Sequence, residues 1–154
     1  MTVLFDTSVL VASLLQRHQF HEPAVAWLAA ARTTSLKMIV SAHSIAEVYS
    51  VLTRLPKGER VSSADAWELI DRNILELATI RTLPAAGYVR LVKQLSVGGF
   101  AGGVVYDAII AEVGRLAKSD ALLTLNVADF ERVTKNGKMP IISPLIDSPP
   151  DSTE

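Results

Sequence analysis

The chain has 154 residues, 49% of them apolar, and a formal net charge of −1. This length suits one domain with a sizeable core. The near-neutral charge excludes an overall positive field that attracts nucleic acid, so any such contact must be local. The absence of cysteine excludes disulfides and thiolate metal sites. Because there is no signal-peptide pattern and no apolar run of roughly 20 residues, we expect a cytoplasmic protein with no membrane partner.

The first half of the chain alternates short apolar runs with helical segments. The apolar and β-branched runs predict strands at 2–5, 37–41 and 78–83. After the N-cap chemistry of Asp6-Thr7-Ser8, the apolar run VLVASLLQ predicts a buried helix. Capping residues and helical periodicity predict further helices that begin at 22, at Ser41 or Ser44, and at 63. The last three are expected to end near 32, 55 and 77. Ser44 and Glu47 also have the spacing of a capping box.

The second half continues the alternation. A helix is predicted from Pro84 to about Leu95, and four glycines within 97–103 predict a loop. The remaining expected elements are a helix at 104–119, a strand at 121–125, a helix at 128–137 and a last strand at 140–144. The polar, proline-containing residues 147–154 are expected to be a disordered tail, so one domain should span 1–146.

Strands that alternate with helices predict an α/β fold. We expect a three-layer α/β/α sandwich with a mostly parallel central sheet of four to five strands. In such sheets, sites form beyond the carboxyl ends of the strands, near the point where strand order reverses.

Three acids stand at the ends of these elements. Asp6 follows the first strand, where it is equally good as a helix N-cap, and the hydroxyls of Thr7 and Ser8 either hold its carboxylate or cap the helix. Glu47 has apolar neighbours, so it should be partly buried rather than a plain capping partner. Asp107 is the strongest signal, because its segment VVYDAIIA contains no other charge.

The fourth segment, TLNVADF, is ambiguous. Asn126 follows a strand and could orient a water molecule, Asp129 could cap the next helix, and Thr124 adds a hydroxyl at the strand end. Acids that share one crevice repel one another, and Mg²⁺ or Mn²⁺ is the counter-ion that carboxylates and water suit best. The three histidines do not form a zinc pattern. His43, near Glu47, could contact substrate, but it is interpreted as a first-turn surface residue.

Four motifs resemble those of the PIN-domain ribonucleases, and the VapC-type toxins of bacterial toxin–antitoxin pairs most of all. They occur in the family's order and cover the chain from about 2 to 145: FDTSVLVA, IAEVYSVLTRL, YDAIIAEVGRLA and LLTLNVADFERV.

The resemblance implies a catalytic role for the residues that match the family's motif positions. Asp6, Glu47 and Asp107 would be the metal-binding acids, with support from Thr7 or Ser8. The fourth position, often Asp in the family, is Asn126 here, and Asp129 is a possible substitute.

The resemblance also implies an activity and partners. We expect a Mg²⁺- or Mn²⁺-dependent endoribonuclease that leaves a 3′-hydroxyl and a 5′-phosphate on tRNA or another structured RNA. A VapB-like antitoxin and a homodimer are the implied partners. Most basic side chains should be ordinary surface charges, but Arg54, Lys57 and Arg60 cluster beyond the helix that carries Glu47 and are the favoured RNA contacts.

Two alternatives remain open. One is a catalytically weak or inactive PIN fold that acts as a binding scaffold, which the departure at Asn126 allows. The other is a phosphohydrolase of another α/β family, such as a haloacid dehalogenase. That family needs a second acid two residues after the first, and Ser8 occupies that position.

Overall fold

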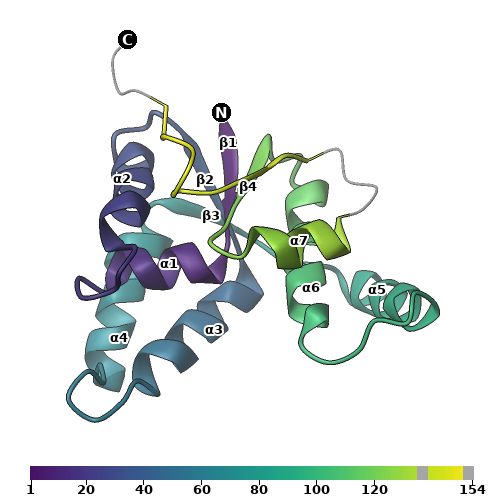
Figure 1. Cartoon of the computed structure of the whole chain (residues 1–154), viewed down its shortest axis with the longest axis horizontal. Helices are drawn as coiled ribbons and strands as arrows, with labels where there is room; N and C mark the ends of the chain where they lie inside the picture. Colours follow the sequence, from purple (N-terminus) through teal and green to yellow (C-terminus); the bar gives the residue numbers. More distant parts are fainter. Residues whose placement is uncertain (135–138, 151–154) are drawn as a thin grey trace.

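A five-stranded parallel sheet forms the centre of the molecule (Figure 1). The computed structural model describes residues 1–134 and 139–150. The sheet order is β3-β2-β1-β4-β5, and every neighbouring pair is parallel. The strands are β1 Thr2–Phe5, β2 Lys37–Ser41, β3 Ala78–Arg81, β4 Ala121–Leu123 and β5 Ile141–Ile142. The predicted α/β/α architecture is confirmed.

Helices cover both faces of this sheet. The described helices are α1 Thr7–Leu14, α2 His21–Arg32, α3 Ala42–Thr53, α4 Ser63–Ile70, α5 Ala85–Val97, α6 Val104–Leu116 and α7 Val127–Val133. A π-helical turn, η1 (Asp71–Leu75), continues α4. Figure 1 shows α1 to α4 on one side of the molecule and α5 to α7 on the other. None of the helices in 1–134 and 139–150 has the length and apolarity that crossing a bilayer requires.

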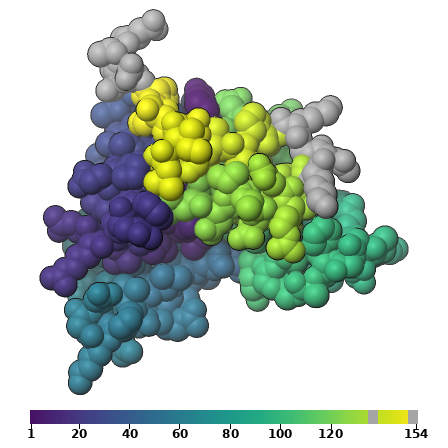
Figure 2. Space-filling view, viewed as in Figure 1, coloured from purple at the N-terminus to yellow at the C-terminus, as the bar shows by residue number. Residues whose placement is uncertain are grey.

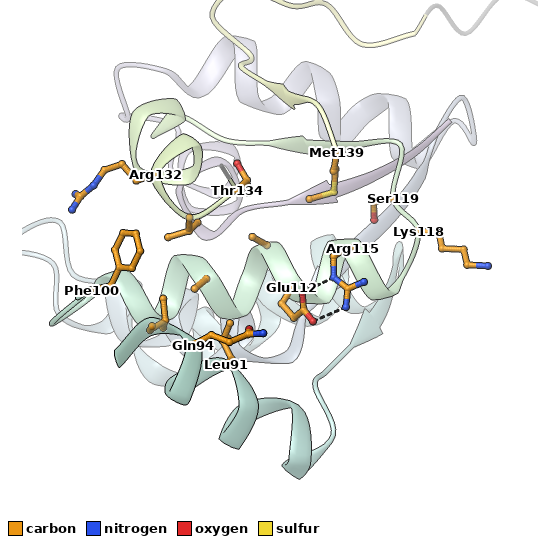
Figure 3. Close-up of a pocket in the computed structure, with 14 residues that line it drawn as sticks. Leu91, Gln94, Phe100, Glu112, Arg115, Lys118, Ser119, Arg132, Thr134 and Met139 are labelled. Atoms are coloured by element: carbon orange, nitrogen blue, oxygen red, sulfur yellow. Dashed lines mark hydrogen bonds and ion pairs between the residues drawn. The ribbon is translucent and has the colours of Figure 1, made fainter. Parts of the chain in front are cut away.

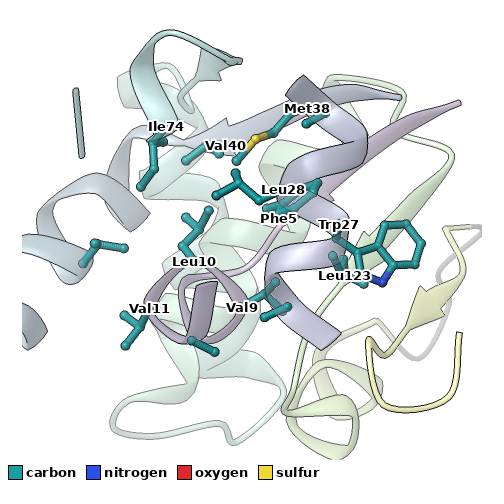
Figure 4. Packing of buried hydrophobic residues seen from close by; sticks show 14 of the residues in the cluster. Phe5, Val9, Leu10, Val11, Trp27, Leu28, Met38, Val40, Ile74 and Leu123 are labelled. Atoms are coloured by element: carbon teal, nitrogen blue, oxygen red, sulfur yellow. The ribbon is translucent and has the colours of Figure 1, made fainter. Parts of the chain in front are cut away.

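Alternate residues of β1 enter two different apolar cores. Val3 and Phe5 belong to the core beneath α1 to α4, whereas Leu4 belongs to the core beneath α6 and α7. A strand that is buried on both faces explains why the sequence shows a continuous apolar run rather than alternation. Figure 4 shows the first core, where Phe5 and Leu123 of the sheet meet Trp27 and Leu28 of α2.

The order of the strands reverses at β1. The chain runs from β1 to β2 and β3 on one side and then returns to place β4 on the other. The gap between β1 and β4 is therefore the switch point, where α/β proteins place their ligands. The strand ends at this point are joined by a hydrogen bond of 2.9 Å from the Asp6 amide to the Leu123 carbonyl.

Several predicted elements end earlier than expected. β4 stops at Leu123 instead of 125, because the Leu125 and Asn126 amides donate to side-chain hydroxyls rather than to a strand. β3 ends at Arg81, α6 ends at Leu116, and β5 is only Ile141–Ile142. The expected end of the last helix, near 137, and the end of the tail, 151–154, lie outside the described residues.

Candidate active site

Asp6 is the buried centre of a hydrogen-bond cluster at the switch point. It is the N-cap of α1, and its side chain is only 4% exposed. Its Oδ2 accepts hydrogen bonds from the Ser8 amide at 3.2 Å, the Ser8 hydroxyl at 2.6 Å and the Thr124 hydroxyl at 2.9 Å. Burial raises the pKa of Asp6 despite these hydrogen bonds, which act to lower it. The N-cap reading of Asp6 is therefore confirmed, and its catalytic role stays a prediction.

The two hydroxyls that hold Asp6 are themselves held by backbone amides. The Ser8 hydroxyl accepts from the Leu125 amide at 3.1 Å, and the Thr124 hydroxyl accepts from the Asn126 amide at 2.9 Å. Each hydroxyl has its acceptor side occupied, so its proton is directed to the carboxylate. All three hydrogen bonds to Asp6 end on Oδ2, which leaves Oδ1 as the oxygen available to a ligand.

The side chain of Glu47 is hydrogen-bonded to Thr7, the first residue of α1. The Thr7 hydroxyl donates to its Oε2 at 2.7 Å, and its other oxygen lies 3.6 Å from Nε2 of His43. The expected capping box is wrong, because Ser41 is the N-cap of α3 and accepts from the His43 amide. The Ser44 hydroxyl is buried without a hydrogen-bond partner among the described residues. Glu47 is therefore free of a capping role and faces Thr7 and His43.

Asp107 lies in the first turn of α6, and its pKa is raised to about 6. Burial is the largest cause, followed by the negative charges of Asp6, Asp129 and Glu47, while Arg132 lowers it. Four carboxylates from four separate segments therefore share one electrostatic environment. Their convergence on one cation stays a prediction.

The donors fit a divalent cation in kind and in charge. They are carboxylate oxygens, which Mg²⁺ and Mn²⁺ prefer, and their mutual repulsion is what a cation would relieve. In the described part of the chain, however, no group of three acidic or histidine side chains is close enough to chelate a metal. Asp6 and Glu47 are instead each held by a hydroxyl.

In the fourth segment, Asp129 acts on the charge of Asp107, while Asn126 contributes its backbone amide to Thr124. Asn126 is the N-cap residue of α7, with an exposed side chain that makes no capping hydrogen bond. Asp129 is exposed, lies 3.8 Å from Arg132, and raises the pKa of Asp107. Thr124 supports the site, as expected, through its hydrogen bond to Asp6.

The three basic residues favoured for RNA binding lie beyond the far end of α3 from His43. Arg54 and Arg60 donate from Nε to the carbonyls of Ser50 and Leu55, and all three side chains are exposed. These two hydrogen bonds use one donor of each guanidinium. Their role in binding RNA stays a prediction.

Sequence reasoning missed a stacked aromatic pair beside the acids. The rings of His43 and Tyr106 have centroids 4.9 Å apart and planes only 11° apart. The interpretation of His43 as a surface residue is wrong, since its side chain is only 23% exposed. Two sequence signals were present: His43 is four residues before Glu47, and Tyr106 directly precedes Asp107.

A hollow of substantial size lies elsewhere, away from the candidate acids. A cavity of about 820 Å³ opens between α5, α6 and α7, and none of the candidate acids lines it (Figure 3). Glu112 lines this cavity and is paired with Arg115 at 2.6 Å. The candidate acids therefore lie outside this cavity. Figure 2 shows a notch between the α3–α4 and α5–α6 segments.

Comparison with known proteins agrees with this geometry. The model of the PIN domain matches residues 3–136. Ribonuclease VapC27 of Mycobacterium tuberculosis is 33% identical over 106 residues, which cover 69% of this chain and 72% of VapC27. A chain of VapBC2 from Rickettsia felis superposes with a TM-score of 0.63 at 17% identity, covering 93% of this chain and 98% of that chain. For VapC20 of M. tuberculosis the TM-score is 0.61 at 16% identity, with 78% and 86% covered. The chain thus belongs to the PIN-domain family, among the VapC-type ribonucleases.

Proposed function

We propose that this protein is a Mg²⁺- or Mn²⁺-dependent endoribonuclease and the toxin of a VapBC-type pair. The observation that carries the proposal is the raised pKa of Asp107, because three other carboxylates contribute to it at the switch point. Like charges that raise the pKa of a neighbouring acid, with only one arginine lowering it, favour the binding of a cation. The similarity to VapC27, a ribonuclease, supports RNA as the substrate.

Each acid has a distinct role in this proposal. Asp6, through Oδ1, and Asp107 would hold the cation. Glu47, fixed by Thr7, would bind through water or accept the proton of the attacking water. Asn126 or Asp129 would orient that water. When bound, the cation would neutralise charge on the phosphodiester and ease deprotonation of water.

The structural relatives support the proposed substrate and partner. VapC20 is described as a toxin that cleaves the sarcin-ricin loop, and VapBC2 was solved bound to a DNA fragment from its promoter. By analogy, the substrate is a structured RNA and the partner a VapB-like antitoxin. A basic side chain of the antitoxin could neutralise the acids in place of the cation. Homodimerisation stays a prediction that light scattering can test.

Two rival functions predict different behaviour. A haloacid-dehalogenase-type mechanism needs an acid where Ser8 stands, and the Ser8 hydroxyl is engaged with Asp6 and Leu125. An inactive scaffold is favoured by one observation, the lack of three chelating side chains within reach of one another in the described residues. The scaffold predicts RNA or protein binding without cleavage.

Cleavage of total RNA, with cut sites mapped, tests the proposal. We expect cleavage with Mg²⁺ or Mn²⁺ and none in EDTA. Asp6→Asn and Asp107→Asn should each lower the rate about 100-fold or more, since losing even an outer-shell partner costs 10- to 100-fold. Glu131→Gln, an exposed acid on α7, is the matched control and should cleave normally. Full activity in Asp107→Asn would refute the assignment.

A further inference from the structure

Tyr106 and His43 form an aromatic shelf at the edge of the acid cluster. His43 comes from the first turn of α3 and Tyr106 from the first turn of α6. Nε2 of His43 is 3.6 Å from Glu47, and Tyr106 adjoins Asp107 in the chain. The shelf therefore connects the two helices that carry these acids.

The shelf has one covered side and one open side. One face of the Tyr106 ring lies against His43, yet the residue remains 47% exposed. Tyr106 belongs to neither apolar core, whereas its neighbour Val105 packs against the second. The exposed ring therefore has no packing role that explains it.

We propose that Tyr106, backed by His43, is a nucleobase-binding subsite that stacks an unpaired base next to the scissile phosphate. The inference rests on the proposed function. A flat aromatic face accepts any base, because every base has a π-face. Bases inside a duplex already stack on one another, so the subsite takes a nucleotide from a loop, a bulge or an end. It therefore directs cleavage to unpaired nucleotides.

A purely structural role makes different predictions. If the ring pair only held α3 against α6, its loss would disturb Glu47 and Asp107 and lower kcat. A stacking subsite acts in binding, so its loss raises KM and weakens RNA binding. Tyr106→Phe keeps the ring and should preserve function in either case. Tyr106→Ala distinguishes the structural role from the stacking role.

The kinetic test uses a short RNA that contains a mapped cut site. Tyr106→Ala should raise KM about 10-fold with little change in kcat, while Tyr106→Phe stays near the wild type. Replacing the nucleotide beside the cut with an abasic one should raise the KM of the wild type by a similar factor. The same replacement should not raise the KM of Tyr106→Ala any further. Tyr49→Ala is the control, because that exposed tyrosine is about 200° from Glu47 around α3.

Binding is measured separately, so the subsite is tested even if no RNA is cleaved. In EDTA, fluorescence anisotropy with a labelled single-stranded RNA should show binding about 10-fold weaker for Tyr106→Ala than for the wild type. A blunt duplex should bind both proteins equally. Unchanged single-strand binding, or a loss confined to kcat, overturns the subsite. Weakened binding with no cleavage by the wild type would keep the subsite and reject the nuclease.

Discussion

At the scale of single residues, some acids are held by hydrogen bonds, whereas the charged form of Asp107 is opposed first by burial and then by repulsion. Asp6 receives three hydrogen bonds and Glu47 one, but the three other acids all raise the pKa of Asp107. A charged residue that lowers the stability of the ligand-free protein but helps to bind a ligand is typical of a functional site.

The pH dependence of stability follows from Asp107. Its pKa of about 6 in the folded protein lies above the ordinary value of 3.8, so folding favours its protonated form. This contribution is complete below pH 3.8 and is lost as the pH rises towards 6. Asp107→Asn should therefore raise Tm relative to the wild type at pH 7.5 in EDTA, and should lose that advantage at pH 4.

Thermal melting at the two pH values measures this effect. Glu131→Gln serves as the control and should follow the wild type at both. A lower Tm for Asp107→Asn at pH 7.5 would show that the carboxylate stabilises the protein without a cation, against the electrostatic argument.

At the scale of elements, tertiary contacts decide where helices and strands end. The strands could be predicted from their apolar and β-branched residues, but the end of β4 depends on the hydroxyls of Ser8 and Thr124. The π-helical turn after α4 could not be predicted, since its periodicity is close to helical. There Asn73 donates to the Leu69 carbonyl and accepts from Arg32, two contacts that need the folded chain.

The same reasoning applies to the site. Asp6 and Asp107 could be predicted, because a lone acid in an apolar segment needs a partner wherever the chain folds. The stacking of His43 on Tyr106 could not, because it joins two helices that are far apart in sequence. The spacing of each residue from its neighbouring acid places both near the site, but it does not indicate that the two rings stack.

The turn after α2 offers a stability prediction. Thr34 has a φ of 63°, a left-handed conformation that a β-branched side chain adopts at a cost, and it is exposed. Thr34→Gly should stabilise the protein by about 1 kcal/mol, or roughly 2–4 °C in Tm. Lys118 also has a left-handed φ, of 54°, but its side chain is unbranched. Lys118→Gly should therefore stabilise the protein less than Thr34→Gly. An unchanged or lower Tm for Thr34→Gly would contradict the prediction.

At the scale of the whole molecule, the acids come from both sides of the sheet. Asp6 and Glu47 belong to segments of the α1–α3 side, and Asp107 and Asp129 to α6 and α7 (Figure 1). A cation between them would join the two sides of the domain. Metal binding should therefore stabilise the entire fold.

Millimolar Mn²⁺ should raise Tm by roughly 5–10 °C if it exceeds the Kd about 100-fold. The shift should vanish in EDTA and be much smaller in Asp6→Asn. Equal shifts in the wild type and in this variant would mean that the cation binds elsewhere.

The hydrogen-bond cluster around Asp6 has a consequence for the synthesis of the chain. One of the hydroxyls that hold its carboxylate, and both amides that fix those hydroxyls, belong to residues 124–126. A nascent chain still on the ribosome, with these residues unmade or inside the exit tunnel, contains Asp6 but lacks its support. Under the proposed function, the active site would thus remain incomplete until translation is nearly finished.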